Sequence, residues 1–342
     1  MRKLLNTLYV TTKDVYLGLD GENIVVLLEG EVNARRPLHN IESIVAFNYA
    51  GASPALIGEC MRRNIAISYI GANGRFLGRV TGPECGSILT RKAQYKLGDD
   101  EAQSAQIARN MVAGKIHNCR SLIERARRDH ALRVDGEKLR RASEYLKNAA
   151  KRVMAANRLD SVRGCEGEAA NVYFSAFDEL ILSDKEAFRF RGRSRRPPLD
   201  RVNALLSFCY ALLAHECGAA LYAAGLDPFA GFLHRDRPGR MSLALDLMEE
   251  LRPAVADRFV LTAINKGIVR SEGFVVEESG AVTMTDETRI AVIKKWQEKK
   301  LEELTHPFLK EKIQWGLVPY AQALLLSRHI RGDLGQYPPF FW

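Results

Sequence analysis

The chain has 342 residues, enough for two domains and a substantial hydrophobic core, and its 50 lysines and arginines against 41 aspartates and glutamates give a formal charge of +9. This excess favours a polyanionic partner, with nucleic acid as the first candidate. No window approaches the roughly 18 apolar residues of a membrane-spanning helix, and no signal peptide is recognisable, so we expect a cytoplasmic protein with no membrane partner. The six cysteines are scattered without a Cys-x-x-Cys pair, which argues against structural zinc and a disulfide framework.

Short β-rich runs dominate residues 1–88. Asp20-Gly21 and Asn73-Gly74 are hairpin-turn signals, and Ser53 before Pro54 predicts the start of a helix. The predicted strands span 4–11, 15–19, 24–28, 65–70 and 75–80, and the predicted helix spans 53–63. No catalytic motif occurs in this N-terminal domain, so we expect it to serve packing or dimerisation.

Helix-forming residues dominate the second predicted domain, residues 89–342. Its first helical stretch, over 90–154, is broken near Gly98 and at Asp135-Gly136. We then expect a largely buried helix or helix pair over 202–225, an irregular segment over 259–285 and a charged amphipathic helix over 286–315. The tail, 331–342, is too rich in glycine and proline for a helix and is expected to be disordered or to act as a docking arm.

Two basic stretches favour contact with nucleic acid. Residues 115–158 hold thirteen lysines and arginines against five acidic residues, more lopsided than a solvated helix face usually is. Residues 189–198 hold five arginines among glycine and proline, which indicates a loop that orders on nucleic acid or an inert linker. The candidate phosphate contacts of this loop are Arg193, Arg195 and Arg196.

A histidine, a basic turn and a helix with carboxylates meet within residues 232–253. Pro238-Gly239 places His234 in a turn, and helical patterning resumes over 241–251 until Pro253 is expected to stop it. At about 100° per residue, Asp246, Glu249 and Glu250 share one stripe. This is typical of a solvated surface helix, but His234 with the neighbouring arginines also suits a divalent metal and phosphate. The candidate phosphate contacts here are Arg235, Arg237 and Arg240.

Glu166 lies on a face of small and apolar residues within 163–174. A buried carboxylate without a partner is costly, so Glu166 must meet a cation, a metal or a hydrogen-bond donor, or else stay exposed. An ion pair with a nearby arginine is the simplest arrangement. Neither a glycine-rich phosphate loop nor a Gly-x-Ser-x-Gly elbow occurs in the chain, which disfavours nucleotide-driven motors and serine hydrolases.

Three motifs in this order and spacing resemble the CRISPR-associated spacer-acquisition nucleases, the integrase subunit of CRISPR adaptation in prokaryotes, with an overall similarity to the subtype I-C version. The resemblance covers essentially the whole chain. The motifs are Arg163-Gly164-x-Glu166-Gly167-x-Ala169-Ala170 with Tyr173-Phe174, Pro197-Pro198-x-Asp200 with Asn203-Ala204-Leu205-Leu206-Ser207, and Gly231-Phe232-Leu233-His234 with Leu243-Ala244-x-Asp246-Leu247-x-Glu249-x-x-Arg252-Pro253.

This resemblance implies an α+β protein in which an N-terminal β-sandwich precedes a larger all-α catalytic domain. It also implies a homodimer formed through the N-terminal domains, and a heterohexamer with a small ferredoxin-like CRISPR-associated partner that holds double-stranded DNA. By motif position, Glu166, His234 and Glu249 are implied to bind Mg²⁺ or Mn²⁺. Glu249 replaces an aspartate common in relatives, and Asp246 is implied as a second ligand or an outer supporting residue.

Such a site could polarise a phosphate and activate an attacking oxygen. Water as the attacker gives nuclease activity, and a DNA 3′-hydroxyl gives strand transfer, which would insert spacer precursors into a CRISPR repeat. Two alternatives remain open from the sequence. They are a non-catalytic DNA-binding scaffold whose acids form ion pairs, and a helical protein-interaction module.

Overall fold

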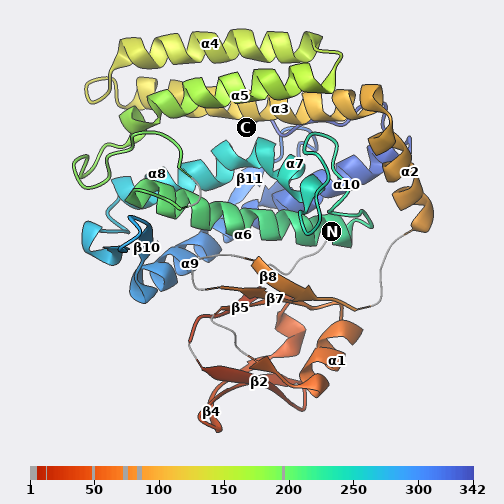
Figure 1. Ribbon diagram of the computed structural model, residues 1–342. Helices are drawn as coiled ribbons and strands as arrows, with labels where there is room; N and C mark the ends of the chain where they lie inside the picture. The colour runs from red at the N-terminus through yellow and green to blue at the C-terminus, as the bar shows by residue number, and fades with distance from the viewer. Residues whose placement is uncertain (1–5, 13, 48–50, 72–75, 83–86, 195–196) are drawn as a thin grey trace. The chain divides into compact units, whose positions relative to one another are not determined.

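The computed structural model describes residues 6–342, apart from 13, 48–50, 72–75, 83–86 and 195–196. The chain divides into two compact units, Met1–Cys85 and Gly86–Trp342 (Figure 1). The first is rich in strands and the second in helices, which confirms the predicted α+β class.

The N-terminal unit contains two four-stranded sheets. One has the order β1-β5-β7-β8 and the other β4-β3-β2-β6. The strands are β1 (Thr7–Val10), β2 (Val15–Asp20), β3 (Asn23–Leu28), β4 (Glu31–Pro37), β5 (Ser43–Phe47), β6 (Gly51–Ala52), β7 (Ala66–Ile70) and β8 (Phe76–Val80). Leu17 and Ile24 from one sheet, Ile44 and Ile67 from the other, and Leu56 from helix α1 (Pro54–Arg62) belong to one buried core. This arrangement agrees with the predicted sandwich.

Local signals predicted about half of this unit. Helix α1 begins where expected, because the Ser53 hydroxyl accepts the Leu56 N–H at 3.2 Å and Pro54 takes the first position. The β2–β3 hairpin is also confirmed, whereas residues 4–5 and the Asn73-Gly74 turn lie outside the described residues. Strands β4, β5 and β6 were not predicted. Strand β4 carries mostly exposed polar residues, and β6 has only two residues, so neither shows a β-like pattern.

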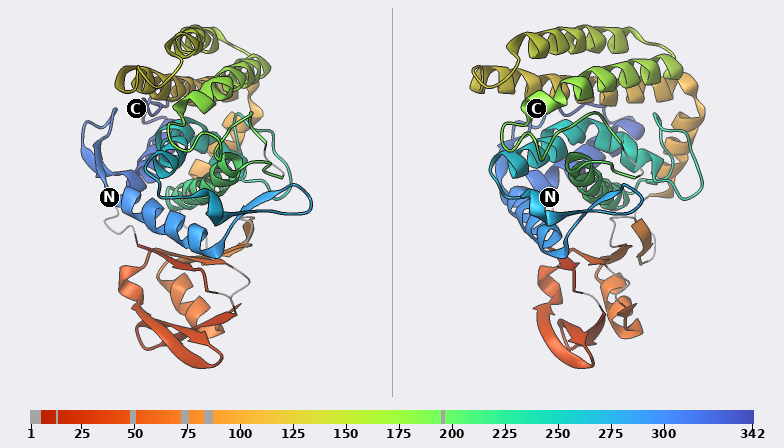
Figure 2. Two further views of the ribbon diagram at one scale, coloured as in Figure 1. Left: turned by 90° about the vertical axis from the view of Figure 1, so that its left-hand side faces the viewer. Right: turned by 60° about the vertical axis from the view of Figure 1, so that its left-hand side comes forward.

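The helical unit is built from long helices in which α3, α4 and α5 form a layer beside the rest (Figures 1 and 2). Two short antiparallel ribbons, β9–β10 and β11–β12, are added to it. The helices are α2 (Ile88–Asp99), α3 (Glu101–Asp129), α4 (Gly136–Ala155), α5 (Leu159–Ala176), α6 (Arg201–Ala223), α7 (Ser242–Leu251), α8 (Arg258–Asn265), α9 (Asp286–Leu301) and α10 (Val318–Ile330). The ribbon strands are β9 (Phe274–Val276), β10 (Val282–Met284), β11 (Glu303–Thr305) and β12 (Lys312–Gln314).

Helix α6 corrects the expectation that no window could span a membrane. By length and composition alone it passes that test, with a mean hydropathy of 1.5 over its most apolar window. That window is 72% buried inside the protein, which is the environment of a core helix. The segment expected as a buried helix or helix pair is therefore one helix at the centre of this unit.

Pro253 does not stop the helix as predicted. Helix α7 continues into a π-helical turn, Arg252–Asp257, and then into α8. A proline lacks the N–H for the α-helical i→i−4 hydrogen bond and its ring crowds the preceding turn, so regular α-helical winding is disfavoured at this point. The segment 259–285 is consequently not irregular throughout, since it begins with α8 and contains the β9–β10 ribbon.

The expectation for the helix near the C-terminal side was also inaccurate. The helix predicted over 286–315 ends at Leu301, and α10 was not predicted. The tail 331–342 is free of helix, as expected, but it is not disordered, because Tyr337 and Phe340 are fully buried. Phe340 accepts a hydrogen bond from Asn118 of α3 at 2.7 Å, so the tail docks within its own unit.

Candidate active site

Helix α7 is buried on both its apolar face and its acidic face. Leu243 and Leu247 pack in the core, but Asp246, Glu249 and Glu250 are also at most 3% exposed. The solvated surface helix considered from the sequence is therefore excluded. Burying three carboxylates on one short helix is costly unless each has partners, and each partner set defines a different role.

Asp246 fixes the loop that carries His234. Its Oδ2 accepts the backbone N–H groups of Phe232 at 2.6 Å and Leu233 at 2.9 Å, and its Oδ1 accepts the N–H of His234 at 2.9 Å. Oδ1 also lies 2.6 Å from Nδ1 of His234. Since a carboxylate accepts these hydrogen bonds, Nδ1 carries a hydrogen, and in a neutral imidazole the lone pair is then on Nε2.

Gly231 is required for this close contact between loop and helix. A Cβ at this position would lie 2.7 Å from Cβ of Ser242 and 3.0 Å from Oδ2 of Asp246. The resulting loop directs Nε2 of His234 toward Glu249, whose Oε1 is 4.0 Å away. Both oxygens of Asp246 are already engaged and the side chain is 0% exposed, which favours the outer supporting role over that of a metal ligand.

Lys115 lies between the two predicted acidic ligands. It comes from α3, is 5% exposed, and its ammonium is 2.6 Å from Oε2 of Glu249 and pairs with Oε1 of Glu166 on α5. Burial lowers the pKa of Lys115, but the two carboxylates outweigh it and leave the pKa raised. The ammonium is therefore charged at neutral pH.

Glu249 is held in the ionised form by several cations. Arg252, one turn later, places Nη1 3.0 Å from Oε1 of Glu249. Burial alone would raise the pKa of Glu249, but Arg252, Lys115 and His234 together lower it to about 2. Glu166 thus forms an ion pair as predicted, but with Lys115 and not with an arginine. Glu249 pairs with the same lysine.

Glu166, His234 and Glu249 converge on one place, but not as a preformed coordination shell. Within the described part of the chain, no group of three or more histidine, cysteine, aspartate or glutamate side chains is placed to hold a metal ion. The donor types nevertheless fit a divalent cation, because two carboxylates and an imidazole nitrogen are common ligands of such ions. The place between the two carboxylates already holds a positive charge, the ammonium of Lys115.

Glu250 was expected to face solvent, and this is wrong. It is 0% exposed and accepts hydrogen bonds from Gln322 at 2.8 Å, from the Phe340 N–H at 2.9 Å and from the Tyr337 hydroxyl. Burial raises the pKa of Glu250 to about 7 against these hydrogen bonds. Adjacent carboxylates on α7 therefore have separate roles, with Glu249 in the site and Glu250 binding the C-terminal tail.

The candidate phosphate contacts are placed unequally. Arg235 and Arg237 are exposed on the turn after His234, and Arg240 is half-buried. Arg193 is tied into the fold, because it donates to Asn203 at 2.6 Å and lies over the ring of Tyr210 with its Cζ 5.3 Å from the centroid. Arg195 and Arg196 lie outside the described residues.

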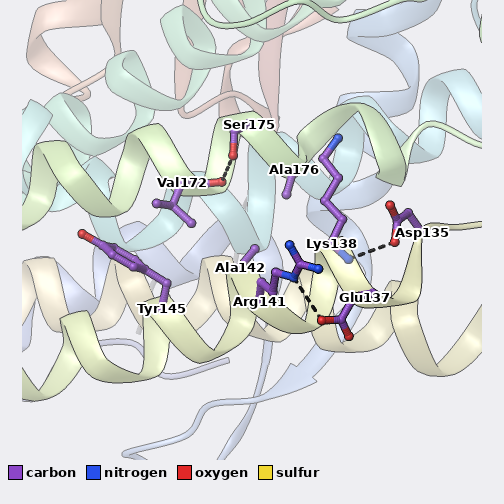
Figure 3. Close-up of a pocket in the computed structure, with 9 residues that line it drawn as sticks. All are labelled: Asp135, Glu137, Lys138, Arg141, Ala142, Tyr145, Val172, Ser175 and Ala176. Atoms are coloured by element: carbon purple, nitrogen blue, oxygen red, sulfur yellow. Dashed lines mark hydrogen bonds and ion pairs between the residues drawn. The ribbon is translucent and has the colours of Figure 1, made fainter.

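A separate hollow of about 490 Å³ lies between α4 and α5 (Figure 3). It is lined in part by Lys138, Arg141 and Tyr145, and Arg141 pairs there with Glu137 at 3.0 Å. None of the residues lining it belongs to the predicted site. The hollow therefore does not compete with the Glu166–His234–Glu249 arrangement as the candidate active site.

Lys115 is the residue between the two acids of the candidate site that sequence reasoning missed. It was counted only as one cation among the thirteen of a basic stretch, and no local pattern distinguishes it from the others. Its neighbour Gly114 offers a weak signal, because a Cβ there would lie 3.0 Å from Cβ of Glu250. This absence of a side chain brings α3 close to α7.

Comparison with known proteins gives a consistent result. A model of the family described as CRISPR associated protein Cas1 matches residues 8–298. A protein of Chlorobaculum tepidum named CRISPR-associated endonuclease Cas1 1 is 49% identical over 342 residues, which cover 100% of both chains.

Two solved structures share the fold. One, described as a casposase bound to integration product, has a TM-score of 0.82 at 20% identity and covers 97% of this chain and 93% of that chain. The other, a Cas6-RT-Cas1–Cas2 complex, has a TM-score of 0.80 at 23% identity and covers 98% of this chain and 36% of that chain.

Proposed function

The chain belongs to the Cas1 family, and from that premise we propose that Glu166, His234 and Glu249 bind one divalent metal ion, Mg²⁺ or Mn²⁺. The protein is a DNA endonuclease and integrase of CRISPR adaptation. Its 49% identical relative is named an endonuclease, which disfavours both a scaffold without chemistry and a pure protein-interaction module.

The observation that carries the proposed site is the convergence of its three side chains from α5, the 232–241 loop and α7. Bound there, a divalent ion would polarise the scissile phosphate and lower the pKa of the attacking oxygen. His234 is prepared for this by Asp246, which keeps the proton on Nδ1 and presents Nε2. Arg252 keeps Glu249 ionised and limits its movement, with 3.0 Å between Nη1 and Oε1.

The same residues serve cleavage and joining. When water attacks, the phosphodiester bond to the leaving 3′- or 5′-oxygen breaks and DNA is cleaved. When a DNA 3′-hydroxyl attacks, the same bond is exchanged and one strand is transferred to another. Neither reaction needs a protein nucleophile, which agrees with the buried, ion-paired carboxylates of the site.

Substituting the three proposed ligands tests this function. Glu166→Ala, His234→Ala and Glu249→Ala should each abolish metal-dependent cleavage and strand transfer, while salt-sensitive binding of duplex DNA survives. Calorimetry with Mn²⁺ should show lost metal binding in the same variants. Glu168→Ala is the matched control, because this exposed carboxylate lies on α5 and pairs only with surface groups at 2.9 Å. Full activity in the three ligand variants would place the reaction elsewhere.

The assembly is proposed on fold similarity. We infer that the protein binds double-stranded DNA together with a small ferredoxin-like CRISPR-associated partner in a heterohexamer, in the cytoplasm, with the N-terminal unit forming a homodimer. One structure of the same fold is described as a complex containing Cas1 and Cas2. Sedimentation of the protein alone at increasing concentration would test the homodimer.

A further inference from the structure

Lys115 is built into the site. Gly114 lets α3 approach α7 so closely that an added Cβ would lie 3.0 Å from Cβ of Glu250. The lysine stem then passes through this crossing, and its ammonium emerges between α5 and α7. A lysine that is only 5% exposed has lost its freedom to sample other partners.

The ammonium of Lys115 and the guanidinium of Arg252 contact the acids of the site differently. Arg252 contacts both oxygens of Glu249, with Nη1 3.0 Å from Oε1 and 3.2 Å from Oε2, and its ion pair is with this one carboxylate. Lys115 contacts Oε2 of Glu249 at 2.6 Å and also Oε1 of Glu166, which belongs to a different helix. It therefore occupies the position between two carboxylates that an ion bridging them would need.

We propose that Lys115 is the resident cation of the site, which holds Glu166 and Glu249 together and must be displaced when a divalent ion binds these carboxylates. This inference rests on the proposed function and adds a residue to it. Lys115 is a positioning residue in this role, since it acts on the reaction through the two acids.

Displacement follows from electrostatics and from valence. An ammonium and a divalent cation at the same pair of oxygens would repel each other within a few ångströms in a partly dehydrated site. A lone pair that binds the metal can no longer accept a hydrogen bond, so these oxygens offer Lys115 fewer acceptor sites when the ion is bound. Glu166 is 26% exposed, so solvent borders this side of the site and the ammonium has water within reach.

Lys115→Met tests the inference through metal affinity. Methionine keeps an unbranched stem of similar length and removes the charge, so the variant should bind Mn²⁺ at least about tenfold more tightly than the wild type in calorimetry of the full chain. Lys300→Met is the matched control, because Lys300 is also buried and pairs with Glu216 at 3.0 Å. A control affinity equal to that of the wild type is expected.

Two outcomes separate this inference from the proposed function. If the wild type binds Mn²⁺, Glu166→Ala does not, and Lys115→Met binds no more tightly than the wild type, the displacement is wrong and the metal site stands. If the wild type itself binds no Mn²⁺, the metal site falls and the inference falls with it.

A measurement on the wild type avoids any folding defect of the variant. Acetylation by acetic anhydride, followed by mass spectrometry, should be slow at Lys115 without metal and at least about threefold faster at saturating Mg²⁺, with Lys300 unchanged. Burial and pairing protect the amine in the first state, and release exposes it in the second. An acetylation rate at Lys115 that saturating Mg²⁺ leaves unchanged would overturn the proposal.

Discussion

At the scale of single residues, the carboxylate of Asp246 links loop folding to catalysis. One pair of oxygens accepts three backbone N–H groups and the Nδ1–H of His234, so the loop cannot form without also orienting the imidazole. A histidine held in this way presents one defined nitrogen to a metal.

Replacing Asp246 by Asn should therefore affect chemistry more than DNA binding. An amide offers one acceptor oxygen in place of two, and its NH₂ group would face backbone donors. Mutating such a supporting group typically lowers metal affinity or activity by about 10- to 100-fold, so we expect the rate of metal-dependent cleavage to fall by that factor. The measurement is the single-turnover cleavage rate alongside DNA affinity in the same buffer.

Asp236→Asn provides the comparison for this loop. Asp236 is exposed and accepts only one hydrogen bond, at 3.3 Å from the Gly231 N–H. Its cleavage rate should stay close to that of the wild type. Equal losses in both variants would show that loop stability, and not the orientation of His234, limits the reaction.

The residues of the site differ in how well the sequence alone predicts them. His234, Asp246 and Glu249 lie within one short stretch, where a turn and helical spacing indicate a cluster. Glu166 could be joined to them only by resemblance to a family. Lys115 is contributed by tertiary packing of α3 against α7, and no local pattern encodes that contact.

At the scale of elements, Asp257 joins three helical segments. It lies at the end of the π turn and accepts the hydroxyl hydrogens of Tyr173 on α5 at 2.9 Å and of Tyr210 on α6 at 2.6 Å. Tyr173 is seven residues after Glu166, so both lie on one face of α5. This contact fixes the helix that presents Glu166.

The same carboxyl should make stability depend on pH. Burial raises the pKa of Asp257 from 3.8 to about 6, although both tyrosines and Arg252 oppose the shift. The folded state therefore holds the proton more tightly than the unfolded chain, and this contribution to the free energy of unfolding is full below about pH 4 and lost as the pH rises to about 6. The loss amounts to about 3 kcal/mol.

Urea unfolding of the wild type and of Asp257→Asn over this pH range measures the contribution. The free energy of unfolding of the wild type, relative to the variant, should fall as the pH rises. Asp160→Asn gives a control of opposite sign, because a hydrogen bond from Arg163 lowers the pKa of Asp160. A wild-type advantage over Asp257→Asn that does not change with pH contradicts the assignment.

The predictable elements were those whose ends are set by capping residues or turns. Caps and turns predicted the starts of α1 and α4, where the Asp135 side chain accepts the Lys138 N–H at 2.9 Å. The π turn at Pro253 was not predictable, because a proline after Leu251 normally ends a helix. Tertiary contacts favour its continuation, among them those of Arg252 and Asp257 with Tyr210.

At the scale of the whole molecule, less positive charge is available to bind DNA than the formal net charge of +9 suggests. Arg140 and Arg141 on α4 are paired with an acid of the same helix, as Arg140 is with Glu137 at 2.8 Å. Surface pairs of this kind contribute little stability but reduce the local field. Arg237 lies instead on an exposed turn beside the site, where its neighbour Arg235 has a longer pair with Asp160 at 3.6 Å.

Salt dependence of DNA binding should reveal that difference. If Arg237 contacts a phosphate, Arg237→Gln should weaken binding to unrelated duplex sequences equally and reduce the slope of log affinity against log salt by about 1. Fluorescence anisotropy at several salt concentrations measures this slope. Arg62→Gln removes the same charge where Glu59 already pairs with it at 2.6 Å, and should leave the slope unchanged. Equal slopes for Arg237→Gln and the wild type would exclude a phosphate contact.

The class and the strand-to-helix order of the whole chain were predictable, whereas the sheet order was not. Hairpin turns specify only neighbouring pairs such as β2 and β3. The parallel pairing of β1 with β5 joins Thr7 to Ser43, and no short-range signal announces a contact at that separation.

The π turn also determines which changes of chain length this segment accommodates. In an α-helix, residues five apart are rotated by about 140° from one another, whereas in a π turn they lie nearly one above the other. Arg252 consequently lies over the ring of Tyr210, while Asp257 accepts its hydroxyl hydrogen. Deleting one residue between them would restore α-helical winding and leave them four apart, again on one face, with little rotation of α8. Insertions and deletions in this segment are therefore as informative as substitutions when variants of the chain are interpreted.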